Sequence, residues 1–171
     1  MPNTLEAMPE IGAGGTLYTM RVKPGIYFAD DPVFGGKRRE LVAEDYVFSI
    51  KRNFDPKLRA PSLYVLEGQI VGMDEVLAKA RRPGSLMDYD TPVEGLRALD
   101  RYTFQIKLAE PSPRFYENLT DARIFGAVAR EIVEAYPDEI MGRPVGTGPF
   151  RLTKWVRSSR VELERSPTFR A

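Results

Sequence analysis

Few residues in this 171-residue sequence have the types and spacing that chemistry requires, and the most distinctive stretch is RPVGTGPFRL, Arg143 to Leu152. A phosphate-binding loop follows its glycines with Lys-Ser or Lys-Thr and a helix N-terminus. Pro149 and an alternating segment stand there instead, which disfavours phosphate binding. Two interpretations of Gly146 and Gly148 stay open. They form a tight turn with positive φ, or they let the backbone approach a ligand closely because they carry no side chain.

The acidic side chains that could serve as acids, bases or metal ligands stand as sequence neighbours. A glycosidase-type hydrolase needs two carboxylates that face each other from separate elements, and Ca²⁺ takes six to eight oxygen ligands. We therefore expect turn and helix-start roles, no catalytic residue and no metal site, and a carboxylate hydrolase stays as an alternative with no residue assigned to it. The pairs are Asp30-Asp31, Glu44-Asp45, Asp88 with Asp90, and Asp138-Glu139.

Composition excludes several other classes of site. The sequence contains no Cys and no His, which removes disulfides, zinc sites with Cys or His ligands, Cys nucleophiles and Ser-His-Asp triads. Its 25 basic and 24 acidic residues give no general attraction to nucleic acid or to an anionic membrane. No apolar run approaches the roughly 20 residues of a membrane span. We expect no cofactor, no nucleic-acid partner and no membrane insertion.

Two local patterns are interpreted as structural. The glycines of IGAGG, residues 11–15, lack the preceding strand, the following helix and the third-glycine spacing of a dinucleotide-binding fingerprint, so we expect a flexible turn. The basic clusters 37–39 and 81–82 have acidic neighbours in the sequence, which is typical of a solvated surface.

The elements that must position these residues mix helices and strands without a strict βαβ order, which favours an α+β class. Period-two patterns predict strands, and apolar spacing of three and four residues predicts helices. The expected strands are 16–22, 26–28 and 101–109, and a hairpin joins 150–156 to 160–165. The expected helices are 43–54, 74–82, 129–136 and one that begins at Pro113.

The same periodicities predict which faces are buried. In the helix 43–54, the buried stripe is expected to contain Ala43, Val47, Ile50 and Phe54, with Tyr46 beside them. In the strand 101–109, the buried face is expected to contain Tyr102, Phe104, Ile106 and Leu108. In the hairpin, Val161 and Leu163 are expected to face inward.

Four segments in order resemble the family 5 extracellular solute-binding proteins, the oligopeptide- and dipeptide-binding proteins of ABC importers. They are LYTMRVKPGIYFADD (17–31), LVAEDYVFSIKRNFDP (41–56), GLRALDRYTFQIKLAEPSPRFYENL (95–119) and VGTGPFRLTKWVRSSRVELERSP (145–167). Two positions depart from the family pattern. Val42 stands where the family has a Thr that would cap the helix, and Ser166 stands where the family has Asn.

The resemblance implies an α+β, periplasmic binding protein type II-like fold, of which this chain is a single partial domain, 1–171. In that reading strands within 16–28 and 146–165 belong to the edge of the main subdomain, and 40–142 forms the accessory subdomain of lobe one. Tyr64 corresponds to an aromatic segment that lines the family's ligand cavity, while Thr147 and Gly148 lie at the edge of the cleft. These three residues are the candidate ligand contacts.

The resemblance also implies a function, which is non-catalytic capture of a peptide or other small solute outside the inner membrane. The partner is an ABC permease, and the location is periplasmic or extracellular, although the sequence begins without a signal peptide. Because half of the cleft is expected to be missing, we expect this chain alone to bind ligand weakly or not at all. The alternative that stays open is a ligand-sensing or interaction domain of a regulatory protein.

Overall fold

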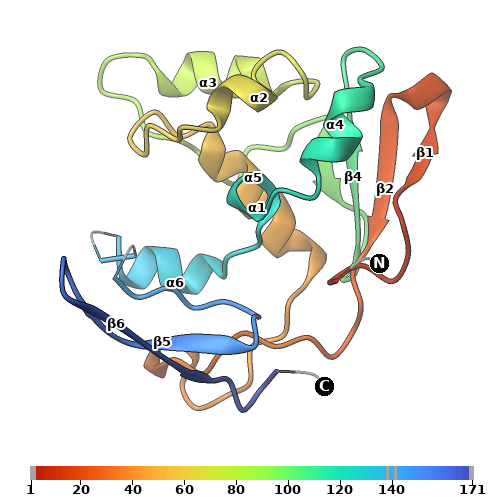
Figure 1. Cartoon of the computed structure of the whole chain (residues 1–171). Helices are drawn as coiled ribbons and strands as arrows, with labels where there is room; N and C mark the ends of the chain where they lie inside the picture. The colour runs from red at the N-terminus through yellow and green to blue at the C-terminus, as the bar shows by residue number, and fades with distance from the viewer. Residues whose placement is uncertain (1–2, 138, 141, 170–171) are drawn as a thin grey trace. The chain divides into compact units, whose positions relative to one another are not determined.

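The computed structural model describes residues 3–137, 139–140 and 142–169, which form two compact units (Figure 1). Unit 1 contains the chain up to Val22 together with Val42–Gly126. Unit 2 contains Lys23–Leu41 together with the chain from Ala127 onwards. Each unit is therefore built from two separate stretches of sequence. These two units do not coincide with the main and accessory subdomains that the family resemblance implies. The assignment of residues to those subdomains stays a prediction.

A four-stranded antiparallel sheet forms one layer of unit 1, with strand order β1-β2-β4-β3. One face carries the apolar residues Tyr18, Met20, Phe104 and Ile106, which are all buried. The other face is polar, and there the Gln105 amide donates to Thr19 Oγ1 at 3.0 Å. The strands are β1 (Glu10–Gly12), β2 (Leu17–Arg21), β3 (Leu96–Ala98) and β4 (Thr103–Lys107).

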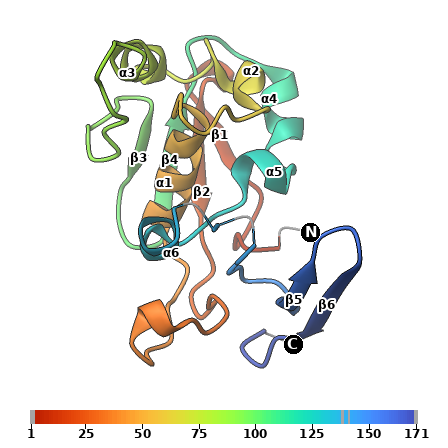
Figure 2. The same ribbon diagram turned by 90° about the vertical axis from the view of Figure 1, so that its left-hand side faces the viewer.

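Helix α1 (Ala43–Asn53) packs on the apolar face of this sheet, and both ribbon views show it beside β4 (Figures 1 and 2). The Tyr46 ring stacks on the Phe104 ring with centroids 4.9 Å apart and planes 8° apart. The expected stripe of Ala43, Val47 and Ile50 is buried, as are Tyr46 and Phe54, so the predicted core face is confirmed. Val42 offers no side-chain cap, and only the reciprocal half of a capping box is present, in which the Asp45 carboxylate accepts the Val42 backbone N–H at 2.8 Å.

Short helices cover the remaining sides of unit 1. Phe115 joins two of its regions, because its ring lies edge-on to Tyr18 at 5.2 Å and to Phe125 at 5.5 Å. Helices α3 and α4 confirm the expectations for 74–82 and for Pro113 onwards within a few residues, whereas α2 and α5 were not expected as helices. They are α2 (Leu63–Leu66), α3 (Met73–Ala80), α4 (Pro113–Asn118) and α5 (Ala122–Phe125).

A buried cation at the end of α1 holds the loop that precedes β3. The Lys51 side chain is 5% exposed, and its ammonium donates to the carbonyls of Tyr89 at 2.8 Å and Thr91 at 2.9 Å. The Tyr89 hydroxyl donates to Asp55 Oδ2 at 2.6 Å. Burial, followed by this bond to Asp55, raises the pKa of Tyr89. These bonds tie the loop to α1.

In unit 2 the segment 26–28 pairs with the segment 39–41. The backbone N–H of Leu41 donates to the carbonyl of Ile26 at 2.8 Å, and that of Phe28 donates to Arg39 at 2.9 Å. The expected strand 26–28 is thus a single bridge, Tyr27 with Glu40. The unit also contains the 3₁₀ turn η2 (Pro32–Phe34), α6 (Arg130–Ala135), and the hairpin of β5 (Phe150–Val156) and β6 (Arg160–Arg165).

The hairpin contradicts one expectation about burial. Val161 and Leu163 do not face inward, because each is 59% exposed. The register places Leu152 opposite Leu163 and Trp155 opposite Val161, so these side chains share one face. Period-two alternation identified the face correctly, but alternation alone does not show whether another layer covers it.

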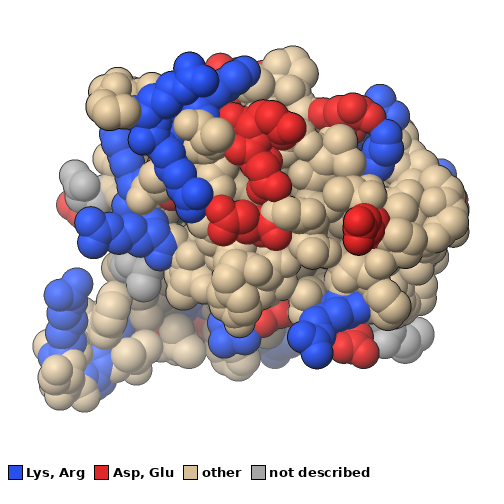
Figure 3. Space-filling model, turned by 90° about the horizontal axis from the view of Figure 1, so that it is seen from above, with Lys and Arg blue, Asp and Glu red and all other residues tan. Residues whose placement is uncertain are grey.

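The basic clusters are on the surface, with one exception. On the face drawn in Figure 3, basic and acidic side chains occupy neighbouring areas, and neither sign covers the face. Arg81 pairs with Glu67 at 3.2 Å. Arg39 is less solvated than expected, because its side chain is 22% exposed and pairs with Glu131 of α6 at 2.7 Å.

The buried ammonium of Lys51 gives a stability prediction. Lys51→Met keeps an unbranched side chain about one atom shorter but removes both hydrogen bonds to the loop carbonyls. We expect the free energy of unfolding to fall by about 1–3 kcal/mol, measured by urea denaturation followed by circular dichroism. Lys79→Met on the exposed surface of α3 is the matched control and should change it by less than about 0.5 kcal/mol. Equal effects of the two substitutions would show that the loop is not held by Lys51.

Candidate functional site

An open hollow of about 440 Å³ lies in unit 2, beside the glycine-containing stretch that stood out in the sequence. Its volume is in the range of small-molecule sites. Three stretches line it: 29–31, 142–145 and 151–155, and Glu164 completes the rim. Met141, which precedes the second stretch, lies outside the described residues, as does Asp138 of the acidic pair with Glu139.

Backbone and side-chain bonds hold the rim together. The N–H of Ala29 donates to the carbonyl of Gly146 at 2.9 Å, which joins the first stretch to the residue that directly follows the second. The Tyr136 hydroxyl donates to Asp31 Oδ1 at 3.1 Å. Burial, and then this bond to Asp31, raise the pKa of Tyr136. The Arg143 guanidinium lies over the Tyr136 ring, 4.2 Å from its centroid.

The hollow is bordered by both signs of charge and by one large aromatic ring. Arg151 and Glu164 pair across the hairpin, so their charges largely satisfy each other. Trp155 is 42% exposed and presents its ring to solvent. The acidic residues are Asp30, Asp31 and Glu164, and the basic ones are Arg143, Arg151 and Lys154. This arrangement can hold a small polar solute, and it lacks the converging carboxylate pair that a hydrolase would need.

Thr147 and Gly148 lie between two of the lining stretches but do not themselves line the hollow. The proposed positive φ is wrong for Gly146 and Gly148, since neither is among the glycines in the left-handed region. A Cβ on Gly146 would meet nothing within 4 Å, and one on Gly148 would meet only the Phe150 carbonyl oxygen at 3.9 Å. The fold of the described residues therefore does not require glycine at these two positions. Close approach of this backbone to a ligand stays a prediction.

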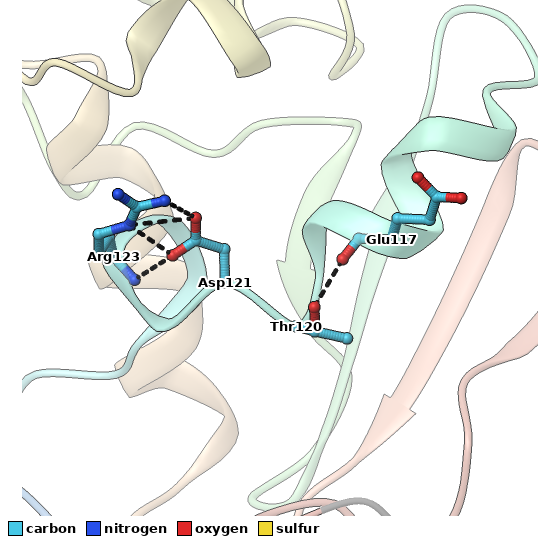
Figure 4. Close-up of polar contacts among 4 residues, drawn as sticks. All are labelled: Glu117, Thr120, Asp121 and Arg123. Atoms are coloured by element: carbon cyan, nitrogen blue, oxygen red, sulfur yellow. Dashed lines mark hydrogen bonds and ion pairs between the residues drawn. The ribbon is translucent and has the colours of Figure 1, made fainter.

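Tyr64 lies in unit 1, on α2, and is 83% exposed. Arg123 of α5 is nearby, since Tyr64 is among the groups that raise the pKa of its guanidinium after Asp121. Figure 4 shows Arg123 against the Asp121 carboxylate, with a guanidinium nitrogen 2.6 Å from Oδ2. The neighbouring Thr120 hydroxyl donates to the Glu117 carbonyl. Tyr64 thus sits on a different unit from Thr147 and Gly148.

Several lining residues were not anticipated from the sequence. No ligand-binding role was predicted from the sequence for Arg143, Lys154 or Trp155, and only the topology of unit 2 brings them to one hollow. Asp88 makes a local turn, because its carboxylate accepts from the Asp90 N–H and the Thr91 hydroxyl. Within the described part of the chain, no group of three or more His, Cys, Asp or Glu side chains is placed to hold a metal ion.

Comparison with known proteins decides the family. The family model for "Bacterial extracellular solute-binding proteins, family 5 Middle" matches residues 1–171. The chain belongs to the family 5 bacterial extracellular solute-binding proteins. The periplasmic oligopeptide-binding protein OppA of Escherichia coli (strain K12) is 33% identical over 132 residues, which are 75% of this chain and 23% of that protein. Di/tripeptide-binding protein 2 of Pseudomonas aeruginosa (strain UCBPP-PA14) is 25% identical, over 94% of this chain and 28% of that protein.

Solved structures show that the family 5 fold is also shared. The structure of Listeria monocytogenes OppA bound to peptide superposes with a TM-score of 0.75 at 19% identity, covering 98% of this chain and 30% of that one. This confirms the α+β, periplasmic binding protein-like class. The family 5 chain described here spans about a quarter of the length of the curated relatives it matches. Among the described residues, no helix combines the length and apolar character needed to cross a bilayer.

The two glycines beside the hollow give a testable prediction for this family 5 chain. Gly146→Ala and Gly148→Ala should leave the free energy of unfolding unchanged or raise it by about 0.4–1 kcal/mol, because Ala fits both backbones and restricts the unfolded chain. Thermal unfolding followed by circular dichroism measures this. Gly35→Ala is the matched control, because Gly35 has a φ of 60° at the end of η2 and Ala would be strained there. A loss of stability in the first two variants comparable to that of the control would contradict the open-space geometry.

The Asp121–Arg123 pair gives a prediction about pH. The hydrogen bond from the Arg123 side chain, and then the one from its backbone N–H, lower the pKa of Asp121 from 3.8 to about 2. A pKa depressed in the folded state stabilises the fold above the unfolded pKa, and this contribution is lost as the pH falls from about 4 towards 2. A carboxyl-detected NMR titration should place the Asp121 midpoint near 2. In Arg123→Gln the midpoint should rise, and an unchanged midpoint would show that the guanidinium is not the cause.

Proposed function

We propose that this protein takes part in non-catalytic capture of a peptide, or a similar small polar solute, for import by an ABC transporter. The observation that carries this proposal is the family 5 match across residues 1–171. The relatives' names specify oligopeptide and di/tripeptide binding. The periplasmic relative in Escherichia coli supports a location outside the inner membrane, where the partner would be an ABC permease.

The hollow in unit 2 supports a solute of this kind. A peptide carries an ammonium at one end and a carboxylate at the other, and the rim presents carboxylates at Asp30 and Asp31 and cations at Arg143 and Lys154. Gly146 and Gly148, next to the hollow, leave the backbone there without side chains, and the Gly146 carbonyl already accepts the Ala29 N–H. Main-chain groups of this type bind peptides without regard to their side-chain sequence. Thr147, Gly148 and Tyr64 remain our proposed ligand contacts.

We also propose that the 171-residue chain alone binds peptide only weakly. Family 5 function relies on two lobes that close on the solute by a hinge motion, and this chain would supply one wall of such a site. A one-sided site stays wet, so its hydrogen bonds and ion pairs compete with water and contribute little net affinity. The strands at 16–28 and 146–165 would then belong to the main subdomain and 40–142 to the accessory one.

Calorimetry and NMR test the two parts of this proposal together. Titration of the chain with tripeptides should give a dissociation constant weaker than about 1 mM by isothermal calorimetry. At millimolar trialanine, amide chemical shifts should move at the hollow and in the stretch Val145–Pro149. Escherichia coli OppA, titrated with the same peptides, is the positive control for calorimetry, and glucose is the uncharged control solute for NMR.

The outcomes separate the claims. Micromolar binding by the chain alone would refute the proposal that this chain binds peptide only weakly by itself. Shifts that are absent, or equal for glucose and trialanine, would refute the hollow as a peptide site. In Gly148→Ala, whose stability we expect to be unchanged, the shifts at Val145–Pro149 should shrink because the new Cβ obstructs backbone contact.

A further inference from the structure

One aromatic side chain in unit 2 contacts both an acidic and a basic residue of the hollow. The Tyr136 hydroxyl donates to Asp31 Oδ1 at 3.1 Å. The Arg143 guanidinium lies over the face of the same ring, 4.2 Å from its centroid. Asp31 and Arg143 both line the hollow, whereas Tyr136 does not. The ring of Tyr136 therefore links two opposite charges of the rim without occupying the space between them.

Helix α6 fixes the backbone from which this ring projects. Tyr136 is the C-cap of α6, and its N–H donates to the carbonyl of Ile132 at 3.0 Å. Pro137 follows and disfavours helical geometry at Tyr136, so the helix ends there. Ile132 is buried, and Glu131 pairs with Arg39 at 2.7 Å, which ties the helix to an earlier segment of unit 2. The Tyr136 ring is thus attached to a fixed element.

Asp31 is oriented through one of its two carboxylate oxygens. Its Oδ1 accepts the Val33 backbone N–H at 3.0 Å, as the N-cap of η2, and also accepts the Tyr136 hydroxyl. Among the residues that the structure describes, Oδ2 has no hydrogen-bond or ion-pair partner. A carboxylate oxygen of this kind can accept a charge-assisted hydrogen bond from an ammonium group.

Arg143 is held by its backbone and by the Tyr136 ring. Its N–H donates to the Glu139 carbonyl at 3.1 Å. The contact with the ring uses the face of the guanidinium and leaves its N–H groups at the edge of the plane. No carboxylate of the described residues forms an ion pair with Arg143. Those N–H groups can therefore bind a carboxylate in the two-bond geometry that guanidinium favours.

The other charged side chains of the hollow are not held in this way. Arg151 and Glu164 pair with each other. The side chains of Asp30 and Lys154 have no hydrogen bond or ion pair to any described residue. A solute that used them would have to order them at a cost in conformational entropy. Asp31 and Arg143 are accordingly the two opposite charges that the hollow presents already oriented.

We propose that Tyr136 is a positioning residue for solutes that carry both an ammonium and a carboxylate group. Asp31 binds the ammonium and Arg143 binds the carboxylate. This inference rests on the proposed capture of a solute at the hollow, and it adds which charged groups the hollow recognises. The hydroxyl of Tyr136 orients the residue for one group and its ring orients the residue for the other, so the two halves can be removed separately.

Three peptides distinguish the two halves in the wild-type chain. Trialanine carries both charges, trialanine amide carries only the ammonium, and N-acetyl-trialanine carries only the carboxylate. NMR at up to ~20 mM peptide follows the Asp31 backbone N–H and the Arg143 side-chain Nε–H. The amide should shift the Asp31 signal, and the acetylated peptide should shift the Arg143 signal. Trialanine should shift both and bind at least about threefold more tightly than either, because its second charge binds intramolecularly.

Two substitutions of Tyr136 separate the hydroxyl from the ring. Tyr136→Phe keeps the ring, so the affinity for trialanine amide should fall at least about threefold while that for N-acetyl-trialanine stays within about 1.5-fold. Tyr136→Leu removes the hydroxyl and the ring, so both affinities should fall. Circular dichroism confirms that each variant is folded, and Tyr136→Phe decides the result alone if Tyr136→Leu does not fold.

Tyr27 is the matched control in the same unit. The Arg38 guanidinium lies over its ring, 3.8 Å from the centroid, but neither residue lines the hollow. Tyr27→Phe should leave both affinities unchanged. A Tyr136→Phe variant that changes neither affinity, or weakens both to the same extent, refutes the positioning role even where trialanine binds and the proposed function stands. A wild-type chain in which none of the three peptides shifts either signal refutes the hollow as a solute site, and this inference with it.

Discussion

The stacking of Tyr46 on Phe104 is the contact on which unit 1 depends, because it joins the central helix to the sheet at the middle of the core. Parallel rings at this distance exclude water from both elements and set the height of α1 above the strands. Once α1 is seated, its far end reaches the loop before β3, where Lys51 and Asp55 fix Tyr89 and Thr91. Packing of α1 on the sheet through Tyr46 thus positions the hydrogen bonds of Lys51 and Asp55 with the loop at the other end of the helix.

Unit 2 relies on a different kind of constraint. Its regular elements are short, and it is tied together by bonds between segments that are distant in the sequence, such as Ala29 with Gly146 and Arg39 with Glu131. These ties bring three stretches to one hollow without a large apolar core beneath it. The hollow is accordingly open and bordered by charge, which suits a polar solute that a second surface would cover.

The sequence predicted β2, β4 and α1 of unit 1 because their burial is periodic, but it did not predict β1, β3, α2 or α5. The stripe of Ala43, Val47 and Ile50 and the alternation through Phe104 and Ile106 each report a local geometry that the fold preserves. Burial of Lys51 could not be predicted, since its two carbonyl partners lie on a loop without any pattern. Val161 and Leu163 are exposed although they were expected to be buried. Alternation shows which side chains share a face of a strand, but it does not show whether another element covers that face. The prediction of positive φ at Gly146 and Gly148 was wrong. The presence of two glycines does not show whether the backbone is in the left-handed region or is simply unobstructed.

The interleaved order of the two units has a consequence for how the chain folds. Lys23–Leu41 belongs with residues that come after Ala127, and the contact of Arg39 with Glu131 spans 92 positions. Loops of that size close slowly, because chain entropy is lost before the contact is gained. As the polypeptide leaves the ribosome, Val42–Gly126 can begin to assemble on the first two strands while Lys23–Leu41 still waits for its partners. The segment that carries Asp30 and Asp31 is therefore among the last to acquire its native surroundings, and a chaperone or a protease would encounter it in that interval.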